Sequence, residues 1–254
     1  MLDDQLLQNY IDTFCGYGNY CGDFWFVGKE EGGGGSIDDI CQRLTAWSGR
    51  GGRALEDVYK YHEAIGVTHL FGQHPKIQPT WGKLIRSLLK AKGQEATLDQ
   101  IRGYQGQDLA RAGGESCLLE LLPLPSPNTG RWLYSDYSQL LQLRERQVYR
   151  EFYAAQRANH IRQRILEHKP RVVVFYSFDA WYQQWWNVIA AGVKFRSHVR
   201  EGFQYGDNGS TLFVIAKHPT ARGVTNQYFE AIGDLIAAHS SHPSVLPNHA
   251  CSIL

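Results

Sequence analysis

The chain has 254 residues, of which 43% are hydrophobic and 20% are charged, and its formal net charge is +1. This length and apolar content suit one sizeable core and exclude a disordered chain, and no apolar run reaches the roughly 20 residues that a membrane span needs. The near-zero net charge neither requires nor excludes nucleic acid as a partner, because only a local basic surface bears on that question.

The two ends of the chain and its cysteines bear on its location. The acidic start is unlike a signal peptide, and five scattered cysteines are typical of reduced thiols rather than of a disulfide framework. We therefore expect a cytoplasmic monomer that does not associate with membranes. The last four residues, Cys251 to Leu254, formally match a prenylation motif, but no polybasic stretch precedes them.

Short apolar runs alternate with helical patterns along the chain. Four runs are nearly continuous, as in parallel strands covered on both faces, and they span residues 23–28, 116–124, 171–178 and 210–218. Helical patterns fit residues 2–12, 52–66, 80–92, 135–169, 179–190 and 224–239. The alternation predicts an α/β fold: a three-layer α/β/α sandwich around a central four-stranded, mainly parallel sheet. We expect a single domain over residues 1–254, with an irregular tail after about residue 240.

The first predicted strand leads into Gly28-Lys29-Glu30-Glu31 and then into four glycines, residues 32–35. A phosphate-binding loop is excluded, because Gly22 precedes Gly28 by one residue too many and Glu30 stands where a hydroxyl is needed. The turn indicates a site that handles water or a cation, with glycines that let another backbone segment come close. A tight turn with two solvated glutamates is the structural alternative.

Polar residues follow the other predicted strands as well, and the carboxyl ends of parallel strands meet at one edge of a sheet, where ligands bind. They are Asn128 in a proline-rich loop after the second strand, Asp179 after the third, and Lys217, His218, Thr220 and Arg222 after the fourth. We expect them to converge with the glycine turn, apart from Asp179, which more simply caps a helix.

The glycine turn at 28–32 and the segment His218-Pro219-Thr220-Ala221-Arg222 resemble the two signature loops of the uracil-DNA glycosylase superfamily. The order of elements over roughly residues 20 to 240 fits the same family. The resemblance implies a DNA glycosylase-like hydrolase of base excision repair. Such an enzyme hydrolyses the N-glycosidic bond of a flipped, damaged or deaminated base, uracil or a related one.

Roles follow from the resemblance, position by position. It implies that Glu30 orients the attacking water, with Lys29 or Glu31 as alternatives, and that His218 stabilises negative charge on the departing base. Thr220 and Arg222 would hold phosphates beside the flipped nucleotide. The basic, glycine-rich segment 48–53 adds two residues that could grip the DNA backbone, Arg50 and Arg53, with a solvated loop as the alternative.

Base recognition departs from the family pattern. Glu120 stands where family members place an asparagine that reads the pyrimidine edge, and a carboxyl group offers a donor only when it is protonated. Cytosine-like or modified bases would suit a carboxylate better than uracil. Candidates for the aromatic side chain that stacks on the base are Phe71 and Trp81, with Trp47 as a third. The family's proline in the first loop is replaced by Glu31.

No cofactor is expected. One branch of the superfamily carries an iron–sulfur cluster on four cysteines, for which Cys15, Cys21, Cys41 and Cys117 would be the candidates. They lack the usual close pair, and Cys117 lies in a predicted central strand, so we interpret them as small hydrophobic residues. The arginines between 144 and 164 predict a solvated helix face, with phosphate contact as the alternative.

Two other functions remain open. A nucleic-acid or nucleotide-binding protein on the same fold, with a catalytic turn that has drifted, is favoured by Lys29, Glu31 and Glu120. An unrelated hydrolase that uses Glu30 and Glu31 for a divalent metal would need further ligands at a matching spacing, which the sequence does not show.

Overall fold

A mixed sheet runs through the centre of the protein. The computed structural model describes residues 1–128 and 130–240, so the predicted tail after about 240 and the Cys251 motif lie outside the described residues. The strands are β1 (Gly16–Gly18), β2 (Phe24–Glu30), β3 (Leu55–Glu56), β4 (Ser116–Leu122), β5 (Val172–Phe175), β6 (Arg196–Ser197), β7 (Gln204–Asp207) and β8 (Leu212–Ile215). They lie in the order β3-β1-β4-β2-β5-β8-β7-β6.

The four predicted strands are confirmed as β2, β4, β5 and β8, which are parallel neighbours at the middle of the sheet. The predicted sheet of four strands is too small, because the described residues form a mixed sheet of eight strands. The strands β1 and β7 pair antiparallel with β4 and β8. The added strands are two to four residues long and carry glycine or polar side chains, so no apolar run reveals them.

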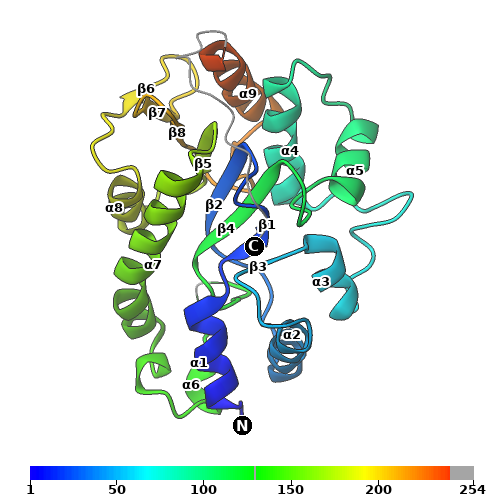
Figure 1. Ribbon diagram of the computed structural model, residues 1–254, viewed down its shortest axis with the longest axis vertical. Coiled ribbons are helices and arrows are strands. Elements are labelled where there is room, and N and C mark those ends of the chain that lie inside the picture. The colour runs from blue at the N-terminus through cyan, green and yellow to red at the C-terminus, as the bar shows by residue number, and fades with distance from the viewer. Residues whose placement is uncertain (129, 241–254) are drawn as a thin grey trace.

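Helices cover both sides of the central strands, with α7 and α8 on one side and α2 to α5 on the other (Figure 1). They are α1 (Asp4–Thr13), α2 (Ile37–Gly49), α3 (Val58–Ala64), α4 (Pro79–Ala91), α5 (Leu98–Gln107), α6 (Tyr134–Tyr137), the 3₁₀ helix η1 (Leu141–Leu143), α7 (Arg146–His168), α8 (Ala180–Ile189) and α9 (Asn226–Ser240). None of the helices over the two described ranges combines the length and the apolar character that a bilayer span requires.

The prediction of one helix over 135–169 is wrong, because α6, η1 and α7 divide this segment. The side chain of Asp4 explains part of the break. It accepts hydrogen bonds from the Ser138 hydroxyl at 2.6 Å and from the Gln139 backbone N–H at 3.0 Å. A backbone N–H bonded in this way does not continue a helix. The predicted end is confirmed: Lys169 adopts a left-handed conformation, with φ of 48°, directly before Pro170.

The strand order places a topological switch point beside β2. The chain passes from β2 to its neighbour β4, and then returns to its other neighbour, β5. In sheets of this kind, ligands bind outside the carboxyl ends of the strands at the switch point. The fold therefore predicts a ligand-binding site at the carboxyl ends of β2, β4, β5 and β8.

Candidate active site

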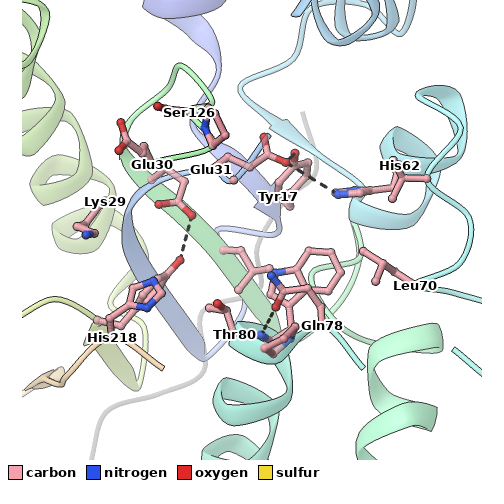
Figure 2. A pocket seen from close by; sticks show the side chains of 18 of the residues that line it. Tyr17, Lys29, Glu30, Glu31, His62, Leu70, Gln78, Thr80, Ser126 and His218 are labelled. Atoms are coloured by element: carbon pink, nitrogen blue, oxygen red, sulfur yellow. Dashed lines mark hydrogen bonds and ion pairs between the residues drawn. The ribbon is translucent and has the colours of Figure 1, made fainter. Parts of the chain in front are cut away.

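A cavity of about 570 Å³ lies at this carboxyl edge. The end of β2 contributes Lys29, Glu30 and Glu31, β4 contributes Glu120, and the segment after β8 contributes His218. Figure 2 shows Lys29 and His218 on one side of the cavity and His62 and Leu70 on the opposite side, with Glu30 and Glu31 between them. Of the residues predicted to converge with the glycine turn, Asn128 and His218 line this cavity, whereas Lys217, Thr220 and Arg222 do not.

The glycine run after β2 fits closely against the rest of the protein. Gly33 and Gly34 have φ of +127° and +66°, and an added Cβ would lie 2.5 Å from the Arg43 guanidinium and 2.6 Å from the Pro125 carbonyl oxygen, respectively. The Ser126 N–H donates a hydrogen bond to the Glu31 carbonyl oxygen at 3.0 Å. Gly33 therefore makes room for the Arg43 side chain, and Gly34 lets the loop after β4 of this same chain come close.

Glu31 is the centre of a buried polar cluster. Its Oε1 atom accepts hydrogen bonds from the Tyr17 hydroxyl at 2.8 Å and from Arg43 Nη1 at 3.0 Å, and Arg43 also pairs with Asp39 at 2.8 Å. His62 Nε2 lies 3.9 Å from the same oxygen. Burial lowers the pKa of His62, and its Nδ1 lies 2.7 Å from the Val58 carbonyl oxygen, which assigns the proton of the neutral ring to Nδ1.

Glu30 points from β2 toward α7, where Arg146 holds its Oε1 atom in a short ion pair. Arg146 also donates to the Ser126 hydroxyl at 2.8 Å and to the Asn128 carbonyl oxygen at 2.7 Å. The second oxygen of Glu30, Oε2, is buried and has no hydrogen-bond partner within the described residues. The expected solvated helix face is therefore wrong for Arg146, and also for Arg157, which is 4% exposed and donates to the Glu120 and Leu121 carbonyl oxygens.

Glu120 has a different environment from the other two carboxyl groups. The Tyr176 hydroxyl donates to its Oε1 atom at 3.0 Å, and no guanidinium or ammonium group forms an ion pair with it in the described ranges. Burial raises the pKa of Glu120 to about 8, although the Tyr176 hydrogen bond acts in the opposite direction. Only glycine fits beneath this pair, since a Cβ on Gly28 would lie 2.2 Å from the Tyr176 hydroxyl and 2.3 Å from Glu120 Oε2.

His218 follows β8 and lies near the Tyr176 ring, with 5.9 Å between the ring centroids. Burial, and to a smaller extent the nearby Lys29 ammonium, lowers the pKa of His218 to about 4. The Thr220 backbone N–H lies 3.3 Å from His218 Nδ1 in donor geometry. The ring is therefore neutral at pH 7 and carries its proton on Nε2.

The other predicted site residues divide into two groups. Lys29, Gly32, Asn128 and Trp81 line the cavity together with the acidic residues and His218. Phe71 does not, because it is buried behind His62 and Trp81, at ring distances of 5.7 and 6.1 Å.

The predicted DNA-backbone residues lie outside the cavity lining. Thr220 contacts the His218 ring, and Arg222 and Arg53 are exposed. Arg50 forms an ion pair with the buried Glu56 at 2.9 Å. One carboxylate therefore already holds the Arg50 guanidinium in place.

The cysteines with described thiols are dispersed. Cys15, Cys41 and Cys117 are free and lie before β1, on α2 and within β4. No group of three or more His, Cys, Asp or Glu residues is arranged to hold a metal ion in the part of the chain that the structure describes. The expectation that no iron–sulfur cluster is bound stays a prediction.

The sequence alone does not identify several residues of the site. Tyr17, Arg43 and His62 come from β1, α2 and α3, which carry no signal of their own near a strand end. Tyr176 directly follows β5, so the rule that sites form at strand ends could have found it.

Comparison of the sequence with models of known protein families finds no match. A comparison with curated proteins likewise finds none.

Proposed function

We propose that this protein is a DNA glycosylase-like enzyme that hydrolyses the N-glycosidic bond of a damaged or deaminated base turned into the cavity. The observation that supports the proposal best is the convergence of Glu30, Glu120 and His218 from three different strand ends on one cavity. Its volume of about 570 Å³ is in the range of sites that enclose a small ligand such as a nucleobase.

The proposed reaction breaks the bond between the sugar C1′ and the base nitrogen, and the electron pair leaves with the base. A water molecule oriented by Glu30 forms the new bond to C1′, and the carboxylate stabilises the positive charge that develops on the sugar. The Glu30 carboxylate then takes the proton that the water loses, and the released base anion takes a proton from solvent. His218, neutral with its proton on Nε2, donates a hydrogen bond to a carbonyl oxygen of the departing base. Glu31 is the alternative water-orienting group, although its Oε1 already accepts from Arg43 and Tyr17.

The state of Glu120 supports a base with a carbonyl group on its recognised edge. A carboxyl group with a pKa of about 8 is mostly protonated at pH 7, so it can donate a hydrogen bond as well as accept one. The expectation from sequence alone, that Glu120 disfavours uracil for want of a donor, rests on an ionised carboxylate. With a neutral acid, uracil and other keto bases become suitable substrates.

The test is a strand-cleavage assay on single- and double-stranded oligonucleotides that each carry uracil, hypoxanthine, xanthine or an oxidised pyrimidine. Hot alkali then breaks the strand wherever a base has been removed. Wild type is compared with Glu30→Gln, His218→Ala and Glu120→Gln, and Glu63→Gln on the exposed side of α3 serves as the control.

We expect cleavage at one kind of base, a loss of at least a hundredfold in Glu30→Gln, and wild-type rates in the control. Excess chelator should change nothing, because the proposed reaction uses no metal ion. A rate that collapses with chelator would favour the metal-dependent hydrolase.

A nucleic-acid-binding protein without catalysis is the second candidate, and one observation favours it. Both carboxylates of the glycine turn are engaged by arginines, Glu30 by Arg146 and Glu31 by Arg43. An ion-paired carboxylate is a weaker base than a free one. Folded protein that binds oligonucleotides but cleaves none of the bases would support this candidate and refute the enzyme.

A further inference from the structure

We propose that a surface beside the cavity, made by Arg150, Trp181 and Trp185, binds an unpaired base of single-stranded DNA. We call this surface the α7–α8 platform. The inference rests on the proposed function only in taking nucleic acid as the partner, and it adds the strandedness of that partner.

The platform lies at the same edge of the sheet as the cavity. Trp181 is in the first turn of α8, which begins shortly after the carboxyl end of β5. Arg150 is in the second turn of α7, one turn after the Arg146 that holds Glu30. Lys29 joins the two sites, because it lines the cavity while its ammonium group lies 5.5 Å from the Tyr182 ring centroid.

The Arg150 guanidinium lies over the Trp181 ring, and the two tryptophan rings meet edge to face. The Arg150 guanidinium carbon lies 3.9 Å from the centroid of the Trp181 ring and 5.2 Å from that of Tyr182. The Trp181 and Trp185 rings are 6.0 Å apart, with an interplanar angle of 65°. Both indoles are half-buried, so part of each remains at the surface.

The charge of the platform is not neutralised within the protein. No ion pair joins Arg150 to a carboxylate in the described residues, whereas the neighbouring Arg146 has Glu30 as its partner. Trp185 Nε1 is buried and has no hydrogen-bond acceptor among these residues. A cationic guanidinium layered on aromatic rings is the combination that holds single strands, where the base stacks and the phosphate is attracted.

A third tryptophan of α8, Trp186, has a structural role and serves as a comparison for Trp181 and Trp185. Trp186 is fully buried, stacks on Phe175 of β5 at 4.9 Å and donates its indole N–H to the Ser177 carbonyl oxygen. Trp181 and Trp185 are only half-buried, and no indole N–H hydrogen bond from either is seen within the described residues. Two aromatic side chains left at the surface beside a cavity therefore favour a ligand-binding role.

Stacking on the platform requires a base whose face is free. In a duplex each base is covered by its neighbours, whereas a single strand can lay one base on the platform while the next enters the cavity. The platform therefore predicts that single-stranded DNA binds more tightly than the matched duplex.

The test is fluorescence anisotropy of a labelled oligothymidylate, with the matched duplex as a second ligand, on the full chain at one fixed salt concentration. Trp181→Ala should weaken single-strand binding about tenfold, which corresponds to about 1.4 kcal/mol and lies within the range for one stacked base. Duplex binding should change by less than twofold. Trp181→Phe keeps a ring and should retain most of the affinity.

The matched control is Phe152→Ala, which removes a 63% exposed aromatic side chain from α7 outside the platform and should change nothing. Arg150→Met should weaken binding and also reduce its salt dependence, and it carries the test should Trp181→Ala not fold. Wild-type affinity in both variants overturns the platform, as does a wild type that binds no single strand.

The two assays distinguish a failure of the platform from a failure of the proposed glycosylase activity. Lost single-strand binding in Trp181→Ala, together with no base removal by wild type, would keep the platform and refute the glycosylase. Base removal by wild type with unchanged binding in the variants would do the reverse.

Discussion

Two glutamates in the same cavity, Glu31 and Glu120, face opposite surroundings. Glu31 has the Arg43 guanidinium at 3.0 Å and the Tyr17 hydroxyl at 2.8 Å, so its charge is paired and solvated by protein groups. Glu120 has one hydroxyl, that of Tyr176, and no cation in contact, and burial raises its pKa to about 8. The same side chain is thus held in an ion pair at one place in the cavity and is a neutral acid at the other.

The difference matches two requirements of the proposed glycosylase reaction. Charged groups belong where positive charge develops, near the turn with Glu30 and Glu31, and a neutral donor belongs where a base edge is read. The two environments therefore predict how the stability of the protein responds when a contact of Glu31 or of Glu120 is changed.

Among the substitutions compared at a fixed pH, the largest effect should follow from breaking the Glu31 ion pair. Arg43→Met leaves a buried carboxylate without its cation, and we expect the free energy of unfolding to fall by about 3 kcal/mol in urea denaturation. The control is Arg102→Met, because the Arg102–Asp99 pair is exposed, and its loss should cost less than about 0.5 kcal/mol. Equal losses in the two variants would mean that Arg43 does not hold Glu31 as a buried ion.

Gly28→Ala tests how tightly Tyr176 and Glu120 pack against β2. The new methyl group would lie 2.2 Å from the Tyr176 hydroxyl and must push Tyr176 and Glu120 apart, at an expected cost of about 2 kcal/mol in unfolding free energy. Gly32→Ala, four residues along the same turn, is the matched control, because no atom lies within 4 Å of its added Cβ. A tolerated Gly28→Ala would show that the Tyr176–Glu120 pair has room to move.

The pH dependence of stability tests the neutral state of Glu120. Its folded pKa, about 8, lies above its ordinary value of 4.5, so the folded state binds the proton more tightly. The stability from this group is complete below about pH 4.5 and is lost as pH rises toward 8, by up to about 1.4 kcal/mol per pH unit.

Glu120→Gln removes this contribution, so its stability should fall less steeply than that of wild type between pH 5 and 8. Urea denaturation at four pH values within this window measures both slopes. Parallel curves would mean that Glu120 is ionised in the folded protein, and the proposed donor to a keto base would then be lost.

The sequence predicts the positions of these groups much better than their states. Glu30 and His218 are found because long apolar runs mark β2 and β8, and functional groups follow strand ends. The partners that decide the charge come from elsewhere in the chain. Arg146 lies 116 residues from Glu30, and the helix α2 that carries Arg43 is missed despite Ser36 at its N-cap. Pairing between distant residues leaves no periodic signal in a sequence.

The short strands are missed for a related reason. β1 and β3 have three and two residues, and β6 and β7 lack an apolar run, so neither length nor alternation marks them as strands. The helix predicted over 52–66 is accordingly wrong in its first part, where β3 lies, and α3 begins only at Val58. Their place in the sheet is set by the strands they join. Tyr17 on β1 therefore reaches Glu31 through a contact that only the assembled sheet creates.

The smallest effect should come from Tyr176→Phe, which removes the hydroxyl that donates to Glu120 and leaves the ring. We expect a loss of about 1 kcal/mol in unfolding free energy, with Tyr205→Phe on β7, outside the cavity lining, as the control. The more informative change is in the titration. The Tyr176 hydrogen bond lowers the pKa of Glu120 against the effect of burial, so its removal should raise that pKa further. The upper end of the pH window in which stability declines should then move to higher pH. If the pH range of this decline does not change, Tyr176 does not affect the pKa of Glu120. The contrast between Glu31 and Glu120 would then depend on burial and on Arg43 alone.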